Sequence, residues 1–348
     1  MNKIVDLRSD TLTKPSAFMR EAIASAIVGD DVFGEDPTVN KLQDTLSELT
    51  GKEAALFVTS GTMGNQLSIK CHTDPGDEII VEASAHIFQY ETAGGAFISR
   101  VQLHPIPGNY GMMKLQDIED SIRPDIYYFP KTRLICLENT HNRAGGTIID
   151  YDYIQDVSLL AKSHGIKMHL DGARLWNASV ATGISIKDYA KHFDSVSICL
   201  SKGLGAPVGS VICGSFEFIE KARKFRKILG GGMRQAGVLA AAGLYAIKNN
   251  VERLADDHKR AKRIADFLSS NDKIDIDLKS VQTNIVIFGF KDQKINTDAF
   301  SLSLKNKGLL ISKGMKGKLR IVTHLDVDDS DIDLAIQILE KARFIFIL

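Results

Sequence analysis

Two residue types with chemical potential, an aspartate and a lysine, each follow a short apolar run in this chain. Asp171 follows the run 167–170, and Lys202 follows the run 195–200. A lysine amine can hold an aldehyde cofactor such as pyridoxal phosphate as a Schiff base, and an acid facing the pyridinium nitrogen keeps the ring an electron sink. Each residue alone has a plainer explanation, because a strand-end aspartate is often a helix cap and a loop lysine is usually structural. The pair together favours pyridoxal phosphate chemistry.

The neighbours of this pair fit the same chemistry. Arg174 comes three residues after Asp171. A guanidinium near the phenolic oxygen of the cofactor would tune the ring, although a surface arginine beside a helix cap is the alternative. Lys202 lies between Ser201 and Gly203, so we expect a constrained loop rather than a helix face. A lysine that must lose its proton near neutral pH gains from partial burial and nearby cations.

A glycine-containing turn follows the apolar run 54–58. It reads Ser60-Gly61-Thr62-Met63-Gly64-Asn65 and opens an expected helix. The free backbone N–H groups and the positive end of a helix dipole suit a phosphate. The competing explanation is that glycine is needed here only for its backbone angles. The turn is neither a Walker loop nor a complete GxGxxG, so it does not support nucleotide binding.

Two histidines follow other expected strands at the same edge. His86 comes after the run 78–82, and His141 lies in the segment 138–142. An aromatic ring at His86 could stack on a cofactor, and either imidazole could act as a general base near neutral pH. Taken singly, each histidine is more often a satisfied polar residue.

Two further segments point to close backbone approach and to anion binding. Gly230, Gly231 and Gly232 precede Arg234, which indicates either a backbone that approaches something closely or an extended helix C-cap. Arg320 stands near the start of the run 319–323. A guanidinium there could grip a substrate carboxylate with two hydrogen bonds, although a surface arginine is the simpler interpretation.

The elements that must position these residues alternate between helices and short apolar strands from about residue 16 to residue 247. Helices are expected at 39–49, 62–71 and 236–247, and strands at 54–58, 78–82, 134–137, 167–170, 195–200 and 209–213. This alternation predicts an α/β domain with a mainly parallel sheet. Ligands bind beyond the carboxyl ends of such strands, where both Asp171 and Lys202 fall.

A second pattern begins near residue 251. Apolar positions recur at helical spacing through residue 268, followed by expected strands at 284–290 and 319–323 and a last helix from about 331. At 348 residues the chain exceeds the usual single core. We therefore expect an N-terminal arm at 1–15, a large α/β domain at 16–250 and a small C-terminal α+β domain at 251–348.

The composition excludes several classes of partner. Hydrophobic residues make up 44% of the chain and charged residues 25%, as in ordinary soluble proteins. Lys plus Arg and Asp plus Glu number 43 each, so neither a nucleic acid nor an anionic membrane is indicated. The basic stretch 221–227 is the one local exception, and the solvated face of a helix is one of two open explanations for it.

Cysteine spacing and the chain's apolar runs indicate a location. The four cysteines form no CxxC pair and no metal-like spacing with histidine, so we expect no metal site. The N-terminus lacks the apolar core of a signal peptide, and no run approaches the ~20 residues that a membrane span needs. A reducing cytoplasm is the predicted location.

Taken in order, these segments closely resemble the low-specificity L-threonine aldolases of the pyridoxal-phosphate-dependent aspartate aminotransferase superfamily, fold type I. The matching stretches are 6–11, 60–65, 138–142, 169–174, 201–207, 230–235 and 320–326. The run 229–237 argues most strongly for aldolases over other members. The resemblance implies a large domain with a mainly parallel seven-stranded sheet flanked by helices, plus a smaller C-terminal α+β domain.

The resemblance also implies how the ring of pyridoxal phosphate is held. Lys202 would carry the Schiff base, and Asp171 would face the pyridine nitrogen. Arg174 would hydrogen-bond near the phenolic oxygen, and His86 would stack on the ring.

The cofactor phosphate and the assembly follow from the same resemblance. Gly61 and Thr62 would hold the phosphate, with Lys227 and Arg234 contributing across a subunit interface. The family implies a homotetramer, a dimer of dimers, with sites completed by neighbouring subunits.

The implied substrate is a small L-3-hydroxy amino acid. Ser9 and Arg320 would bind its carboxylate, and His141 would lie near its β-hydroxyl. The implied reaction is retro-aldol cleavage of L-threonine, L-allo-threonine and related amino acids to glycine and an aldehyde. The base stays open between His86, His141 and a water that they hold. Alternatives are β-elimination, racemisation, or cofactor binding without turnover.

Overall fold

The computed structural model describes residues 3–315 and 317–346, and its larger part is built on a seven-stranded sheet. The strand order is β2-β10-β9-β8-β7-β3-β4, and only β10 runs antiparallel to its neighbours. The strands are β2 (Ala54–Val58), β10 (Ser210–Gly214), β9 (Ser195–Cys199), β8 (Lys167–Gly172), β7 (Thr132–Glu138), β3 (Glu78–Glu82) and β4 (Gln102–Ile106). The predicted fold class, with its mainly parallel seven-stranded sheet, is confirmed.

The strands of this sheet show why the sequence patterns predicted most of them. Every residue of β3 and β9 is buried, as expected for central strands covered on both faces. The edge strand β4 was not predicted, and in β4 only Ile106 is buried. Its sequence includes Pro105, which cannot donate to a ladder and is tolerated at an edge.

Helices cover both faces of the large sheet. Alternate strand residues point to opposite faces, so Leu56 and Val58 pack with α3 and α9, whereas Ala55 and Phe57 pack in the other, larger apolar cluster. The helices of this part are α1 (Ala17–Ala24), α2 (Pro37–Thr50), α3 (Gly61–His72), α4 (His86–Gln89), α5 (Leu115–Asp120), α6 (Tyr151–Ser163), α7 (Leu175–Thr182), α8 (Ile186–Ala190), α9 (Phe216–Ile228) and α10 (Gly237–Asn250).

Short elements complete the larger part. A small hairpin pairs β5 (Gly108–Asn109) with β6 (Met112–Met113), a 3₁₀ turn spans Asp10–Leu12, and a π turn spans Gly95–Ser99. No helix within residues 3–315 and 317–346 is long and apolar enough to cross a membrane.

The C-terminal part forms a second, antiparallel sheet in the order β11-β12-β15-β14. Its strands are β11 (Ile274–Ile276), β12 (Ile285–Phe290), β15 (Leu319–Val322) and β14 (Ser312–Lys313), and its helices are α11 (Leu254–Ser269), α12 (Thr297–Asn306) and α13 (Asp329–Phe346). A 3₁₀ turn lies at Leu278–Ser280. This part has its own apolar cluster, and we propose that it is the small domain.

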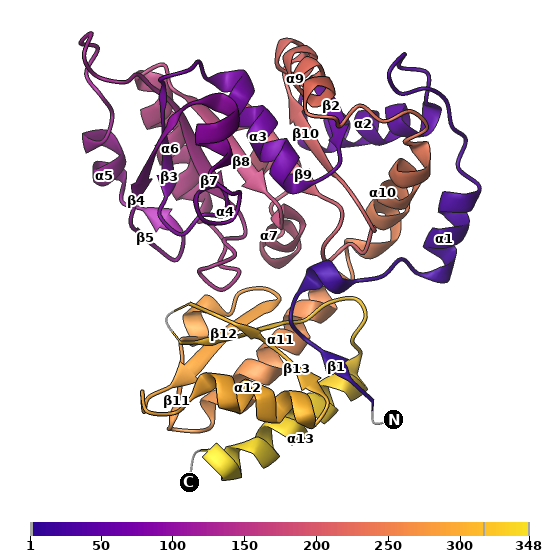
Figure 1. Cartoon of the computed structure of the whole chain (residues 1–348), viewed down its shortest axis with the longest axis vertical. Helices are drawn as coiled ribbons and strands as arrows, with labels where there is room; N and C mark the ends of the chain where they lie inside the picture. The colour runs from indigo at the N-terminus through magenta and orange to yellow at the C-terminus, as the bar shows by residue number, and fades with distance from the viewer. Residues whose placement is uncertain (1–2, 316, 347–348) are drawn as a thin grey trace.

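The N-terminal arm joins the C-terminal part rather than the large sheet. β1 (Val5–Asp6) pairs in parallel with β13 (Leu309–Leu310), and Val5 and Leu7 are buried in the C-terminal cluster. Figure 1 shows indigo β1 beside β13 in the lower part of the molecule. The arm therefore crosses between the two sheets, which brings residues 8–13 to the gap between them.

Candidate active site

The predicted site residues lie where the parallel strands end. Asp171 is the penultimate residue of β8, His86 opens α4 after β3, and Gly61 opens α3 after β2. Figure 1 shows α4 and α7, which follow β3 and β8, on the side of the large sheet that faces the C-terminal part. The carboxyl edge of the sheet therefore collects these side chains, as the topology requires.

Asp171 is buried, and its carboxylate is held by donors on both oxygens. Asn65 donates its side-chain amide N–H to Asp171 Oδ2 at 2.8 Å, and the backbone N–H of Ala173 donates to Oδ1 at 3.1 Å. Both neighbours are donors, so each carboxylate oxygen is fixed as an acceptor. A carboxylate fixed in this way can accept a further N–H from a ligand.

His86 lies beside Asp171 and is anchored by two glutamates. Its Nδ1 is 2.8 Å from Glu91 Oε1, and its backbone N–H donates to Glu138 Oε2 at 2.6 Å. Nitrogen and oxygen atoms of His86, Glu91 and Asp171 all lie within 4.8 Å of one another. Burial lowers the pKa of His86, but the Glu91 hydrogen bond and the charge of Asp171 outweigh it, so the pKa is raised.

His141 is fully buried, and both of its ring nitrogens have partners. Nε2 lies 2.9 Å from Glu82 Oε2, and Nδ1 accepts the backbone N–H of Ala144 at 3.2 Å. Burial lowers the pKa of His141, whereas the charges of Glu138 and Glu82 raise it, with a net increase. The Ala144 N–H needs the Nδ1 lone pair, however, so it opposes a second proton at that atom.

Arg174 forms a buried ion pair that the sequence did not predict. Its Nε and Nη2 donate to the two carboxylate oxygens of Asp10, each at 2.7 Å. Burial alone would raise the pKa of Asp10, but Arg174, Lys202 and Arg320 hold it well below its usual range. Asp10 belongs to the segment 6–11 that carries the family resemblance, which was the signal available in the sequence.

Arg320 reaches the same site from β15 of the C-terminal sheet. Its Nη2 donates to Asn142 Oδ1 at 2.8 Å, while its buried Nε has no hydrogen-bond partner. Among residues 3–315 and 317–346, no carboxylate forms an ion pair with it. Burial and the charge of Arg174 lower its pKa to about 10. This guanidinium is therefore poised for an anion that the chain itself does not supply.

Lys202 faces the same cluster. The Nζ amine makes no hydrogen bond or ion pair with any described residue, and its charge lowers the pKa of Asp10. Its carbonyl accepts the Thr13 hydroxyl at 2.9 Å, which ties the lysine loop to the N-terminal arm. The arm, the large sheet and the C-terminal sheet thus all contribute to one site.

The turn at the start of α3 has the features of an anion site. Ser60 caps the helix by accepting the Met63 N–H at 3.1 Å. The first helical turn leaves the N–H groups of Gly61 and Thr62 without helical partners. The glycine run approaches this turn, since a Cβ at Gly231 would lie 2.6 Å from the Met63 sulfur.

Three predicted site residues have other partners or surroundings within the single chain. Arg234 pairs with Asp30 at 2.9 Å, and Lys227 lines a separate surface pocket of about 410 Å³. The Ser9 hydroxyl accepts the Thr11 N–H and caps the short 3₁₀ turn. No hydrogen bond or ion pair between described residues joins these side chains to Asp171, Lys202 or Arg320, so their predicted roles stay predictions.

Comparisons with known proteins point in one direction. A model of the family described as beta-eliminating lyase matches residues 6–291. Low-specificity L-threonine aldolase 1 of Arabidopsis thaliana is 45% identical over 343 residues, covering 97% of this chain and 96% of that protein. The low specificity L-threonine aldolase of Escherichia coli K12 is 42% identical over 325 residues, covering 93% and 95%. The solved structure of Leishmania major threonine aldolase superimposes with a TM-score of 0.82 at 20% identity, covering 96% and 98%.

Proposed function

The chain belongs to the beta-eliminating lyase family and, within it, to the low-specificity L-threonine aldolases, and from this premise we propose its cofactor, substrates and residue roles. The enzyme cleaves L-threonine, L-allo-threonine and related L-3-hydroxy amino acids to glycine and an aldehyde, with pyridoxal phosphate as cofactor. One observation carries most of the weight: half-buried Arg320, whose Nε has no hydrogen-bond partner and which pairs with no carboxylate among the described residues, lies in the same site as Lys202 and the Asp10–Arg174 pair.

The residues at the sheet edge fit pyridoxal phosphate. The Lys202 amine has no partner among the described residues and can attach the aldehyde. Asp171 can accept the pyridine N–H, and the N–H groups of Gly61 and Thr62 can hold the phosphate. When bound, the cofactor supplies the electron sink for the bond that breaks. His86, within 4.8 Å of Asp171, would stack on its ring.

Arg320 would bind and orient the substrate carboxylate. Asn142 Oδ1 accepts hydrogen bonds from both Arg320 Nη2, at 2.8 Å, and Arg174 Nη1, at 3.3 Å. The amide therefore ties the carboxylate-binding guanidinium to the one that is anchored on Asp10. Because the direction of the carboxylate decides which bond of the amino acid lies perpendicular to the ring, this link would help to select Cα–Cβ cleavage. Ser9 is the second proposed carboxylate ligand.

His86 is the better-placed acceptor for the β-hydroxyl proton. Its Nδ1 hydrogen-bonds to Glu91, which leaves Nε2 to accept a proton, and its raised pKa makes it a stronger base. His141 has both nitrogens engaged, so we propose that it holds the hydroxyl region in place through its neighbours rather than accepting the proton.

A homotetramer with shared sites is the proposed assembly. Large apolar side chains are exposed near Lys227, including Phe33 and Ile228 at 73% and 74%. Exposed apolar groups of this kind mark surfaces that a partner covers. A neighbouring subunit on this surface would bring Lys227 and Arg234 to another subunit's phosphate. A cytoplasmic location is proposed as well, in keeping with four buried free thiols.

The test is a substrate panel with the purified, cofactor-loaded protein. L-Threonine and L-allo-threonine should each yield glycine and acetaldehyde in equal amounts, the aldehyde being detected with an alcohol dehydrogenase. Pyruvate and ammonia from L-serine or L-cysteine, with no glycine from either threonine, would instead establish β-elimination. Analytical ultracentrifugation of the same sample tests the tetramer.

A further inference from the structure

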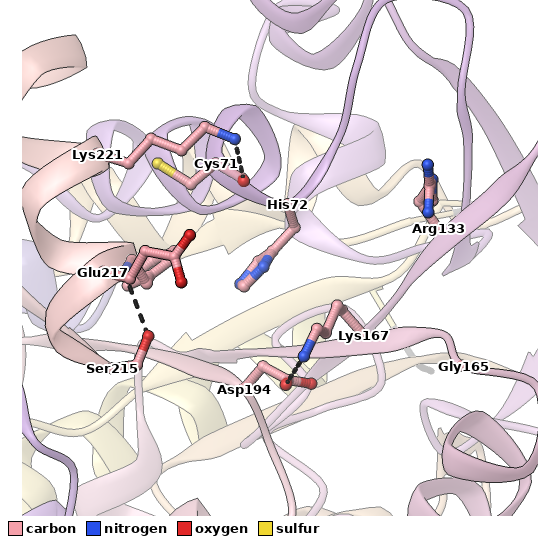
Figure 2. A pocket seen from close by; sticks show the side chains of 10 residues that line it. Cys71, His72, Arg133, Gly165, Lys167, Asp194, Ser215, Glu217 and Lys221 are labelled. Carbon is pink, nitrogen blue, oxygen red and sulfur yellow. Dashed lines mark hydrogen bonds and ion pairs between the residues drawn. The ribbon is translucent and has the colours of Figure 1, made fainter.

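A second pocket lies at the opposite edge of the large sheet from the candidate active site. It has a volume of about 380 Å³, and residues at the start of β8 and at the end of α3 line it, including Lys167 and His72. Figure 2 shows the His72 side chain pointing into this pocket, and its ring stacks on Phe218 with centroids 4.9 Å apart. Helix α3 runs from the active-site edge to this edge, so it connects the two places.

Buried polar side chains link His72 to Asp171. The contacts are His72 Nε2 to Ser195 Oγ at 2.8 Å, Ser195 Oγ to His169 Nδ1 at 2.9 Å, His169 Nε2 to Asn65 Oδ1 at 3.1 Å, and Asn65 Nδ2 to Asp171 Oδ2 at 2.8 Å. We call this set of four side chains, His72, Ser195, His169 and Asn65, the Asp171 relay.

The secondary structure aligns the Asp171 relay on one face. Asn65 and His72 are seven residues apart on α3, which is two helical turns, so they share a face of the helix. His169 and Asp171 are two residues apart on β8, so they point to the same side of the sheet. Ser195 is the direct partner of His169 in the β8–β9 pairing. The sequence thus brings these polar residues together where this face of the sheet meets α3.

The direction of every hydrogen bond in the relay is fixed by its chemistry. Asn65 Nδ2 lies 2.7 Å from Glu91 Oε1 as well as 2.8 Å from Asp171 Oδ2, so it must donate to both carboxylates. Its Oδ1 must then accept, and His169 Nε2 must carry the proton that it donates. A neutral His169 accepts at Nδ1 from the Ser195 hydroxyl, whose oxygen in turn accepts from His72 Nε2.

Both histidines of the relay remain neutral. Burial lowers the pKa of His169 to about 4 and that of His72 to about 3. The relay therefore brings aligned dipoles and no net charge to Asp171. Its last donor also separates two buried carboxylates, those of Asp171 and Glu91, which would otherwise face each other without a proton between them.

We propose that the Asp171 relay positions the Asp171 carboxylate as a hydrogen-bond acceptor for the cofactor's pyridine nitrogen, with its far end open to the pocket of His72. This inference rests on the proposed function, since it assigns the relay to the pyridoxal phosphate site. Asn65, His169, Ser195 and His72 are positioning residues, because they act through Asp171. Unsatisfied polar groups in these buried places would destabilise the fold, so a complete chain of partners also explains why the sequence keeps them polar.

The decisive comparison uses two serines in equally buried places. Ser195→Ala breaks the relay in its middle, whereas Ser68→Ala removes a buried hydroxyl of α3 that donates only to the Gly64 carbonyl, at 2.9 Å. The dissociation constant of pyridoxal phosphate is measured by equilibrium dialysis of each variant. A neutral hydrogen bond lost from the relay should weaken binding about fivefold in Ser195→Ala, with no change in Ser68→Ala.

Variants at the two ends of the relay give independent readouts. Asn65→Leu removes the donor to Asp171 and should weaken cofactor binding by roughly ten- to a hundredfold. His72→Gln can still donate an N–H to Ser195 and should bind the cofactor as the wild type does, whereas His72→Leu should behave like Ser195→Ala. The visible absorbance of the bound cofactor is also followed across pH. The pH midpoint of its change should shift in Ser195→Ala, Asn65→Leu and His72→Leu, and should stay unchanged in Ser68→Ala and His72→Gln.

The outcomes separate this proposal from the proposed function. Equal dissociation constants and spectra for Ser195→Ala and Ser68→Ala would overturn the relay, even if Asn65→Leu fails to fold. A wild-type protein that binds the cofactor and cleaves L-threonine, with relay variants unchanged, would refute the relay alone. A wild-type protein that binds no pyridoxal phosphate would refute the proposed function itself.

Discussion

Replacing Arg320 with leucine should make the cofactor-free protein more stable and, at the same time, weaken its affinity for substrate. Arg320 is a half-buried guanidinium whose Nε is fully buried, with one hydrogen bond, to Asn142, and no ion pair to any carboxylate among residues 3–315 and 317–346. An unpaired buried charge destabilises the folded state until an anion arrives. Stability and substrate binding are therefore expected to change in opposite directions.

The size of the effect follows from the pKa of Arg320. Burial and the charge of Arg174 lower it from 12.5 to about 10, which corresponds to a cost of about 3 kcal/mol for the charged form at neutral pH. This cost is fully present below the pKa of Arg320 in the folded protein. It decreases as pH rises from there toward the pKa of the unfolded protein. Losing the Asn142 hydrogen bond lowers the free energy of unfolding by about 1 kcal/mol. Arg320→Leu should thus raise the free energy of unfolding by about 1–2 kcal/mol.

Urea unfolding of the cofactor-free protein measures its stability, and steady-state kinetics of the loaded enzyme measure KM for the substrate. KM for L-threonine should rise about a hundredfold, as expected when about 3 kcal/mol of charge-assisted hydrogen bonding is lost. Arg226→Leu is the matched control, since Arg226 is buried but paired with Asp31 at 2.7 Å. That variant should lose about 3–5 kcal/mol of stability. If Arg320→Leu loses as much stability and keeps its KM, Arg320 is structural and the reasoning is wrong.

Two further variants test neighbouring interactions. Asp10→Asn leaves Arg174 buried without its counter-charge, so the free energy of unfolding measured in urea should fall by about 3–5 kcal/mol; unchanged stability would contradict the buried pair. Glu91→Gln removes a hydrogen bond that raises the pKa of His86. In the wild type, charged His86 therefore contributes stability that is present below its unfolded pKa of 6.5 and lost as pH rises through the folded pKa. The acid limb of kcat/KM against pH should move to lower pH in Glu91→Gln, and an unmoved limb would exclude His86 as the base.

The large sheet was predictable because its central strands are buried on both faces. The expected strands at 54–58 and 78–82 match β2 and β3 residue for residue. The edge strand β4 has no such run, since it contains His104 and Pro105 among exposed or half-buried positions. Its pairing with β3 depends on tertiary context that local composition does not encode.

The sequence indicated a site only through combinations of residues. Asp171 and Lys202 were informative as a pair after two apolar runs, and Arg320 became a candidate ligand only through the family resemblance. Asn65 was not singled out, because its role depends on Asp171, which lies 106 positions along the chain and meets it only in the folded sheet. The role of Glu91 likewise could not be predicted, because a single glutamate shows no recognisable spacing in the sequence.

The most direct test determines which lysine holds the cofactor. The loaded enzyme is reduced with sodium borohydride, which fixes pyridoxal phosphate on the amine that holds it, and the digested protein is mapped by mass spectrometry. We expect the phosphopyridoxyl group on the peptide that contains Lys202, and no such label in Lys202→Ala treated in the same way. Labelling of another lysine, or a fully labelled Lys202→Ala variant, would contradict the assignment on which the rest depends.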